Sequence, residues 1–182
     1  VWVRLSGRML VKLIAASSMM LFSGLAIRGL ISLDKVVLGL SDLHGTLPAY
    51  AFFAVMAFGI VPVMENAVFI YLMPELVSAA GRRDRSGFAR QMRHAVFVVS
   101  GVAMTYVVIL LPFADVVVDW IGHPYYREKF SILYLLLAAS VTYVLAMVGY
   151  YGVYALRQSK RLFLNNTIAL LFCHIIYFVL WF

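Results

Sequence analysis

Charged and polar side chains occur inside long apolar runs, where they can line a polar cavity. Arg28 lies within the first run and Lys35 follows it seven residues later, while Glu65 and Asn66 lie near the middle of the second. Ionisable side chains within a membrane usually face a bundle interior or a water-filled cavity. We therefore interpret these four residues as candidate substrate-binding residues. The alternatives are a structural Arg28–Glu65 or Asp34–Lys35 pair and a Lys35 side chain that snorkels to the interface.

An aromatic pattern in a later run adds two further candidates. Tyr143, Met147, Tyr150 and Tyr154 are spaced by four, three and four residues and form one stripe on a helix. Tyrosine rings in a polar cavity can stack on sugar rings, so Tyr143 and Tyr150 are candidate substrate-binding residues. Helix packing and a place in the interfacial aromatic belt are the alternatives.

The sequence contains no motif of a known catalytic or metal centre. We find no G-x-S-x-G, Walker A, H-E-x-x-H or glycine-rich dinucleotide loop. The histidines and the single cysteine, Cys173, lack metal-ligand spacing. We therefore expect no catalytic residue, no metal and no cofactor, and a transporter rather than an enzyme.

The composition is that of an integral membrane protein. Of 182 residues, 64% are hydrophobic and 13% are charged, and the mean hydropathy is +0.95. Soluble domains are about 45–50% apolar and about 25% charged. The net charge of +7 does not indicate nucleic-acid binding, because most of the basic residues lie in short gaps between apolar runs.

Five apolar runs predict a bundle of about five transmembrane helices in a single domain, residues 1–182. The predicted spans are 9–33, 47–79, 95–118, 130–156 and 162–182. The second span exceeds the membrane thickness, and Pro62 predicts a kink in it. The basic link 81–94 predicts a short amphipathic helix at the inner membrane surface, in contact with membrane lipids. Because both chain ends look cut, we expect a fragment of a larger polytopic protein.

The distribution of basic residues predicts the orientation of the bundle. Eleven of the fifteen Lys and Arg residues fall on one side if the five spans alternate. The positive-inside rule makes that side cytoplasmic, including the basic loops 81–94 and 157–161.

The order of several short motifs resembles a known transporter family. The motifs are "LDKVVLG" (33–39), "LMPELVS" (72–78), the basic link 81–94, "WIGHPYYREKFSILYLLLA" and "ALRQSKRLFLNNTIALL". Together they are similar to the C-terminal lobe of polysaccharide flippases in the multidrug/oligosaccharidyl-lipid/polysaccharide exporter superfamily. The resemblance covers nearly all of residues 30–180. Glu65 and Glu75 depart from the family pattern and leave the substrate open.

The resemblance implies one half of a two-lobe exporter fold in a bacterial cytoplasmic (inner) membrane. It implies a flippase that moves lipid-linked oligosaccharide for cell-surface polysaccharide such as lipopolysaccharide, with the missing N-terminal lobe as a partner. Arg28 would then contact the diphosphate of the polyprenyl carrier, since guanidinium groups bind phosphate bidentately.

Several other functions remain open at this point. A lipid-linked cell-wall precursor flippase and a cation-coupled multidrug antiporter of the same superfamily are the first alternatives. A membrane-embedded polysaccharide polymerase or glycosyltransferase, or a non-transporting scaffold, are further ones.

The orientation can be tested by labelling single introduced cysteines from either side of the membrane. Cysteines at Arg85 and Ser159 should react only from the cytoplasm, and cysteines at Asp42 and His123 only from outside. The unsubstituted chain is the control for labelling of Cys173. Labelling of positions 159 and 123 from the same side would contradict the predicted topology.

Overall fold

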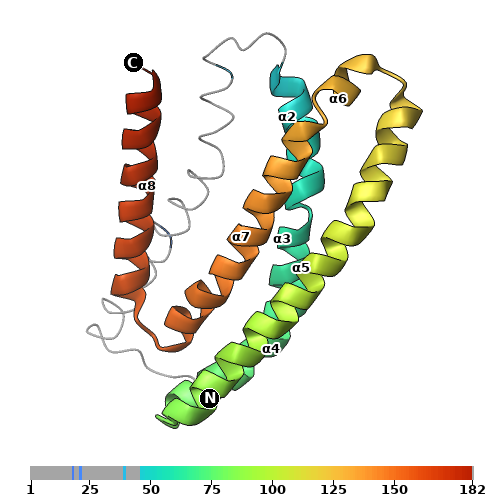
Figure 1. Ribbon diagram of the computed structural model, residues 1–182. Helices are drawn as coiled ribbons and strands as arrows, with labels where there is room; N and C mark the ends of the chain where they lie inside the picture. Colours follow the sequence, from blue (N-terminus) through green and yellow to red (C-terminus); the bar gives the residue numbers. More distant parts are fainter. Residues whose placement is uncertain (1–17, 19–20, 22–38, 40–45, 182) are drawn as a thin grey trace, which may run out of the picture. The chain divides into compact units, whose positions relative to one another are not determined.

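A computed structural model describes residues 18, 21, 39 and 46–181 of the chain (Figure 1). The chain divides into two compact units, Leu38–Leu156 in one and Val1–Val37 with Arg157–Phe182 in the other. Nearly all of the predicted span 9–33, with Arg28, and the candidate Lys35 lie outside the described residues.

The described residues form helices and short turns, with no strand among them. The helices of the first unit are α2 (Thr46–Phe58), α3 (Ile60–Val63), the π-helix η1 (Met64–Phe69), α4 (Ile70–Gly81), α5 (Arg85–Ile121), α6 (Pro124–Glu128) and α7 (Ser131–Ala155). The second unit contains α8 (Ser159–Trp181).

Three of the described segments are long and apolar enough to cross a membrane: Thr46–Gly81, Arg85–Ile121 and Ser131–Ala155. They overlap the predicted spans 47–79, 95–118 and 130–156. The chain is therefore an all-α membrane protein. The predicted fifth span is helical as α8, and its crossing of the membrane stays a prediction.

Small residues let the three spans approach closely. Helix α7 packs against both α2 and α5, and α4 packs against α5. Fully buried alanines occur in α2 and α5, for example Ala57, Ala103 and Ala114. At Gly152 of α7, an added Cβ would lie 2.8 Å from the Met92 side chain of α5. Small residues are enriched at such interfaces because apolar lipid offers little hydrophobic drive for helix association.

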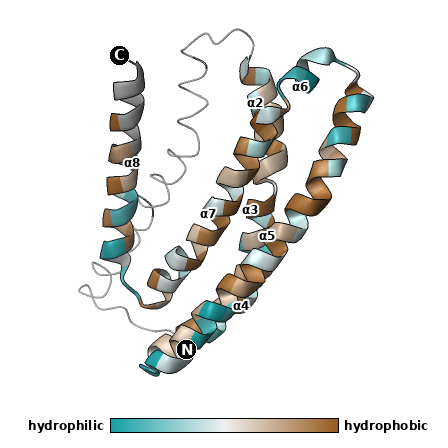
Figure 2. Cartoon of the chain, viewed as in Figure 1, coloured by the Kyte–Doolittle hydropathy of each residue, from teal (hydrophilic) through white to brown (hydrophobic). Residues whose placement is uncertain are grey.

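The outward surface of these spans suits lipid. Large apolar side chains such as Phe97 and Trp120 are 78% and 86% exposed, and the hydrophilic residues gather toward the helix ends (Figure 2). Polar side chains inside the spans bond their own helix: the hydroxyls of Thr105, Thr142 and the buried Ser140 each donate to a backbone carbonyl of the preceding turn.

The turn between α4 and α5 is short because both helix ends are capped by the chain itself. The amide of Asp84 donates to the carbonyl of Ala79 and that of Arg83 to Ala80, with Arg83 at φ 56°, which is a Schellman ending. Asp84 then caps α5, accepting from the Gly87 N–H at 2.9 Å. The prediction of a separate amphipathic helix over 81–94 is therefore wrong, because the cap at Asp84 starts one continuous helix that runs to Ile121.

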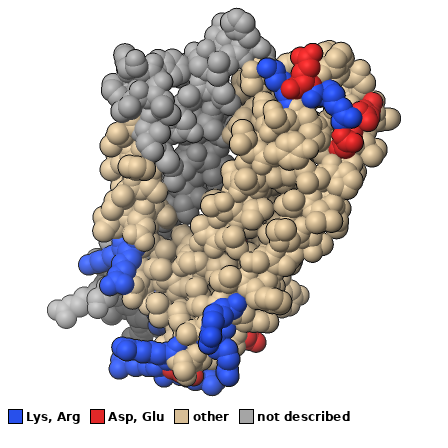
Figure 3. Space-filling view, viewed as in Figure 1, with Lys and Arg blue, Asp and Glu red and all other residues tan. Residues whose placement is uncertain are grey.

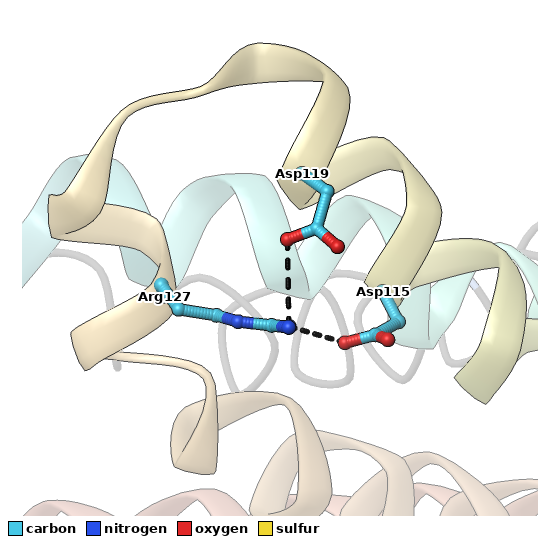
Figure 4. Close-up of polar contacts among 3 residues, drawn as sticks. All are labelled: Asp115, Asp119 and Arg127. Atoms are coloured by element: carbon cyan, nitrogen blue, oxygen red, sulfur yellow. Dashed lines mark hydrogen bonds and ion pairs between the residues drawn. The ribbon is translucent and has the colours of Figure 1, made fainter.

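The opposite end of α5 is tied to α6 by an ion-pair cluster (Figure 4). Gly122, at φ 66°, ends α5, and His123 caps α6. Arg127 donates to Asp115, and its other nitrogen lies 3.4 Å from Asp119. The hydrogen bond to Asp115 and the negative charge of both aspartates raise the pKa of Arg127. All three side chains are about half exposed or more, so the cluster orients α6 more than it stabilises the fold.

The first long segment is irregular near its middle. Helix α2 ends at Phe58, and the residues after Gly59 form α3 and then the π-helix η1. The sequence predicts a kink at Pro62; the α-helix is interrupted one turn earlier, at Gly59. Pro62 has no N–H to donate to the carbonyl one turn before it, which weakens the helix there. The hydroxyl of Tyr106 on α5 donates to the nearby Met56 carbonyl and fastens this region to its neighbour.

A double-mutant cycle tests this fastening. A Cβ on Gly59 would lie 2.9 Å from the Tyr106 hydroxyl oxygen, so Gly59→Ala should displace the hydroxyl and destabilise the bundle. Tyr106→Phe should lower the free energy of unfolding by about 1 kcal/mol, the net worth of one hydrogen bond.

Because Tyr106→Phe removes the colliding atom, Gly59→Ala should be less destabilising in that background. The comparison is made by reversible unfolding in detergent. The control is Gly149→Ala, whose Cβ meets nothing within 4 Å. Additive effects of the two substitutions would show that the contact does not couple them.

Candidate functional site

Glu65 is an acidic side chain at the middle of a membrane-spanning segment. It is the twentieth residue of the 36-residue segment Thr46–Gly81, and its side chain is exposed. It lies in η1, and π-helical turns within α-helices are frequent at functional sites. It forms no ion pair with a described residue. A carboxylate at this depth without a basic partner favours a polar ligand or a water-filled cavity beside it.

Glu65 borders an open groove with a volume of about 370 Å³. The other lining residues are Phe69, Ile70, Met73, Pro74, Val77 and Tyr151. The rings of Phe69 and Tyr151 stack with their centroids 4.2 Å apart and an interplanar angle of 26°, which holds the α7 wall against η1. The groove thus has apolar and aromatic walls with one carboxylate at its edge.

One of the predicted tyrosines, Tyr143, lies near this carboxylate. Tyr143 and Tyr151 are both within electrostatic range of Glu65, and Tyr150 is within range of both tyrosines. The ring of Tyr150 packs edge-on against Tyr151, with centroids 5.6 Å apart. Tyr143 and Tyr150 do not line the groove, although Tyr143 is within electrostatic range of Glu65. Their role in substrate binding stays a prediction.

Asn66 has a described contact within its own segment. Its amide nitrogen donates to the carbonyl of Pro62 at 2.9 Å. In a π-helix the backbone hydrogen bonds shift by one residue, so a side-chain donor here helps to satisfy the carbonyls around the irregular turn. The role of Asn66 in ligand binding stays a prediction.

The predicted stripe on α7 divides between core and surface. Met147 is buried at 6% exposure, whereas Tyr154 is 40% exposed. The residue that completes the groove is Tyr151, which the sequence analysis did not select. Tyr151 lies outside the helical spacing of Tyr143, Met147, Tyr150 and Tyr154, so the sequence pattern gave no reason to select it. Its place in the groove follows from its stacking against Phe69.

Charge elsewhere in this unit lies at the two ends of the spans (Figure 3). One end has five arginines and one aspartate within residues 81–94, and the other has three acidic and two basic residues within 115–129. Glu65 lies between these ends. Its carboxylate can hold a cation or accept hydrogen bonds from hydroxyl groups, and it repels phosphate.

Phosphate binding beside Glu65 would therefore require basic residues, and the predicted ones, Arg28 and Lys35, lie outside the described residues. The described residues contain no group of three or more His, Cys, Asp or Glu side chains that could hold a metal ion.

Comparisons of the chain with models of known protein families, with curated proteins and with solved structures find no match.

Cysteine accessibility tests whether Glu65 faces water. A cysteine at Glu65 should react with a membrane-impermeant maleimide several-fold faster than one at Ala67, which is also exposed and at similar depth but points away from Glu65 around the helix. The helical content of both variants is measured as the control for correct folding. Equal, slow reaction at both positions would place Glu65 in lipid or in a dry contact.

Proposed function

We propose that this chain is part of a flippase that moves lipid-linked oligosaccharide across the cytoplasmic membrane for cell-surface polysaccharide synthesis. Two features support the proposal: the order of the motifs over residues 30–180, and the polar site around Glu65 in a membrane span. The observation that carries it is the order of the motifs over residues 30–180. The exposed mid-span carboxylate near Tyr143 adds a polar site, because an ionisable group in a membrane span usually faces a cavity or a polar ligand.

In this proposal the groove contacts the sugar portion of the cargo. Glu65 accepts hydrogen bonds from sugar hydroxyls, and Tyr151 in the groove wall offers an aromatic surface. Arg28 and Lys35 neutralise the diphosphate, which is unfavourable in a low-dielectric cavity without cations. A second lobe of the same protein provides the facing wall, and rocking of one bundle against the other alternates access to the site. We infer no enzymatic step.

A second candidate is a cation-coupled multidrug antiporter, and the groove itself favours it. Glu65 has no basic partner among the described residues and can attract a cation, and the stacked Phe69 and Tyr151 rings with the apolar walls suit an amphipathic organic cation. The two candidates differ in the sign of the charge that the cavity must stabilise. They can therefore be separated by which charged residue transport depends on.

Substitutions at Arg28 and Glu65 test both candidates. If the cargo is a diphosphate, Arg28→Ala should abolish flipping at normal protein level, and Arg28→Lys should recover it only in part, because lysine cannot make a bidentate contact. Flipping is measured as accumulation of lipid-linked sugar in a deletion strain. If the cargo is a cation, Glu65→Gln should abolish drug resistance while Glu65→Asp retains part of it.

The structural alternative has a distinct outcome. If Arg28 and Glu65 only pair with each other, each single alanine variant should lower protein level, and the double variant should restore it. Full flipping by Arg28→Ala would reject the role of Arg28 in binding the cargo.

A further inference from the structure

A second, polar groove lies between α4 and α5 at the arginine-rich end. It has a volume of about 340 Å³ and is lined on its polar side by Ser78, Arg82, Asp84, Arg90 and Gln91. Pro74 and Glu75 border it farther along α4. This groove is distinct from the one beside Glu65 and takes no part in the proposed transport.

The two arginines of this groove are available to a ligand. Neither Arg82 nor Arg90 forms an ion pair or a side-chain hydrogen bond with a described residue, and both are exposed. They come from different elements, the turn after α4 and the second turn of α5, and converge on one space. Two guanidinium groups in one groove match the oxygens of a phosphate, which arginine binds through paired N–H donors.

The carboxylate of Asp84 is already engaged. It accepts from the Gly87 N–H at 2.9 Å and from the Ser86 hydroxyl at 2.8 Å. These hydrogen bonds, the one from Gly87 first, lower the pKa of Asp84, and the positive charge of Arg90 adds a smaller effect in the same direction. Asp84 thus serves the start of α5, and the end of this helix is not itself the site. Five arginines against this one aspartate leave residues 81–94 strongly positive.

The surface below the groove suits an acyl chain. Phe97 follows Arg90 by seven residues, which places it on the same side of α5, about 10 Å farther into the span. It is 78% exposed, and the adjacent Val96 is 46% exposed. Arg82 and Arg90 can bind a phosphate, and the exposed Val96 and Phe97 can contact an acyl chain. A phospholipid can use both contacts, whereas free phosphate can use only the first.

We propose that the groove between α4 and α5 binds the phosphate of a phospholipid head group through Arg82 and Arg90, with an acyl chain along Phe97. Glu75 opposes the phosphate charge and limits the affinity. This binding fixes α4 and α5 at the membrane surface, since basic residues near anionic lipid are attracted to it.

The test is a titration of the purified protein in detergent with dioctanoyl phosphatidylglycerol, read by native mass spectrometry. Arg82→Gln with Arg90→Gln should weaken binding at least about tenfold, because it removes charge-assisted hydrogen bonds. The matched control is Arg85→Gln with Arg93→Gln, which removes the same charge from the same end outside the groove lining. At physiological salt it should weaken binding less than about threefold. Glu75→Gln should tighten binding.

Further probes identify the part of the ligand that is recognised. Dioctanoylglycerol, which lacks the phosphate, and inorganic phosphate, which lacks the chains, should both bind more weakly than the phospholipid. The variant Arg82→Lys with Arg90→Lys should bind with intermediate affinity, which separates loss of the site from loss of folding.

Three results would overturn the proposal. Equal losses in the two double glutamine variants would indicate only a diffuse positive field. Equal binding of inorganic phosphate would exclude a lipid ligand, and weaker binding after Glu75→Gln would indicate a cation site.

Discussion

The fold depends on one constraint: inside a bilayer, each backbone and side-chain polar group must find its partner within the protein. Helices satisfy the backbone, and the hydroxyls of Thr105, Ser140 and Thr142 return to carbonyls of their own helix. Since lipid is as apolar as the side chains it meets, the spans associate through close packing at small residues such as Ala57 and Gly152. Against this background a mid-span carboxylate without a described partner is an exception, and Glu65 is that exception.

The same constraint explains why the irregular turn and the polar site coincide. Pro62 removes a backbone donor, and the chain responds with the break at Gly59 and the π-helical turn that follows. The Asn66 amide and the Tyr106 hydroxyl then donate to carbonyls on either side of the break. The turn that carries Glu65 is consequently held by side chains as well as by its backbone. Such a segment can present a polar group at a fixed place without the regular hydrogen-bond ladder.

The two ends of the bundle differ in how their charges are used. At the α5–α6 end, Arg127 is neutralised by Asp115 and Asp119, so the turn is a self-contained structural unit. At the α4–α5 end, Asp84 is committed to the helix cap, and neither Arg82 nor Arg90 forms an ion pair or a side-chain hydrogen bond with a described residue, although the charge of Arg90 acts on Asp84. An excess of positive charge on one side orients a membrane protein. In the groove between α4 and α5, Arg82 and Arg90 belong to this excess and also converge on one space.

The sequence alone determined the membrane class and the three described spans. The length of an apolar run is a local property, and the thickness of the bilayer decides whether that run can span it. It also identified Glu65 as a candidate, because a polar group in an apolar run can be recognised without the fold; the roles predicted for Tyr143 and Tyr150 stay predictions. Only the tertiary structure decided that α5 continues through the basic link, because the cap at Asp84 depends on a turn conformation that composition does not encode. The choice of Tyr151 over Met147 for the groove, and the convergence of Arg82 with Arg90, likewise depend on which helix faces meet. That pairing is set by packing between residues far apart in sequence, which no local pattern reveals.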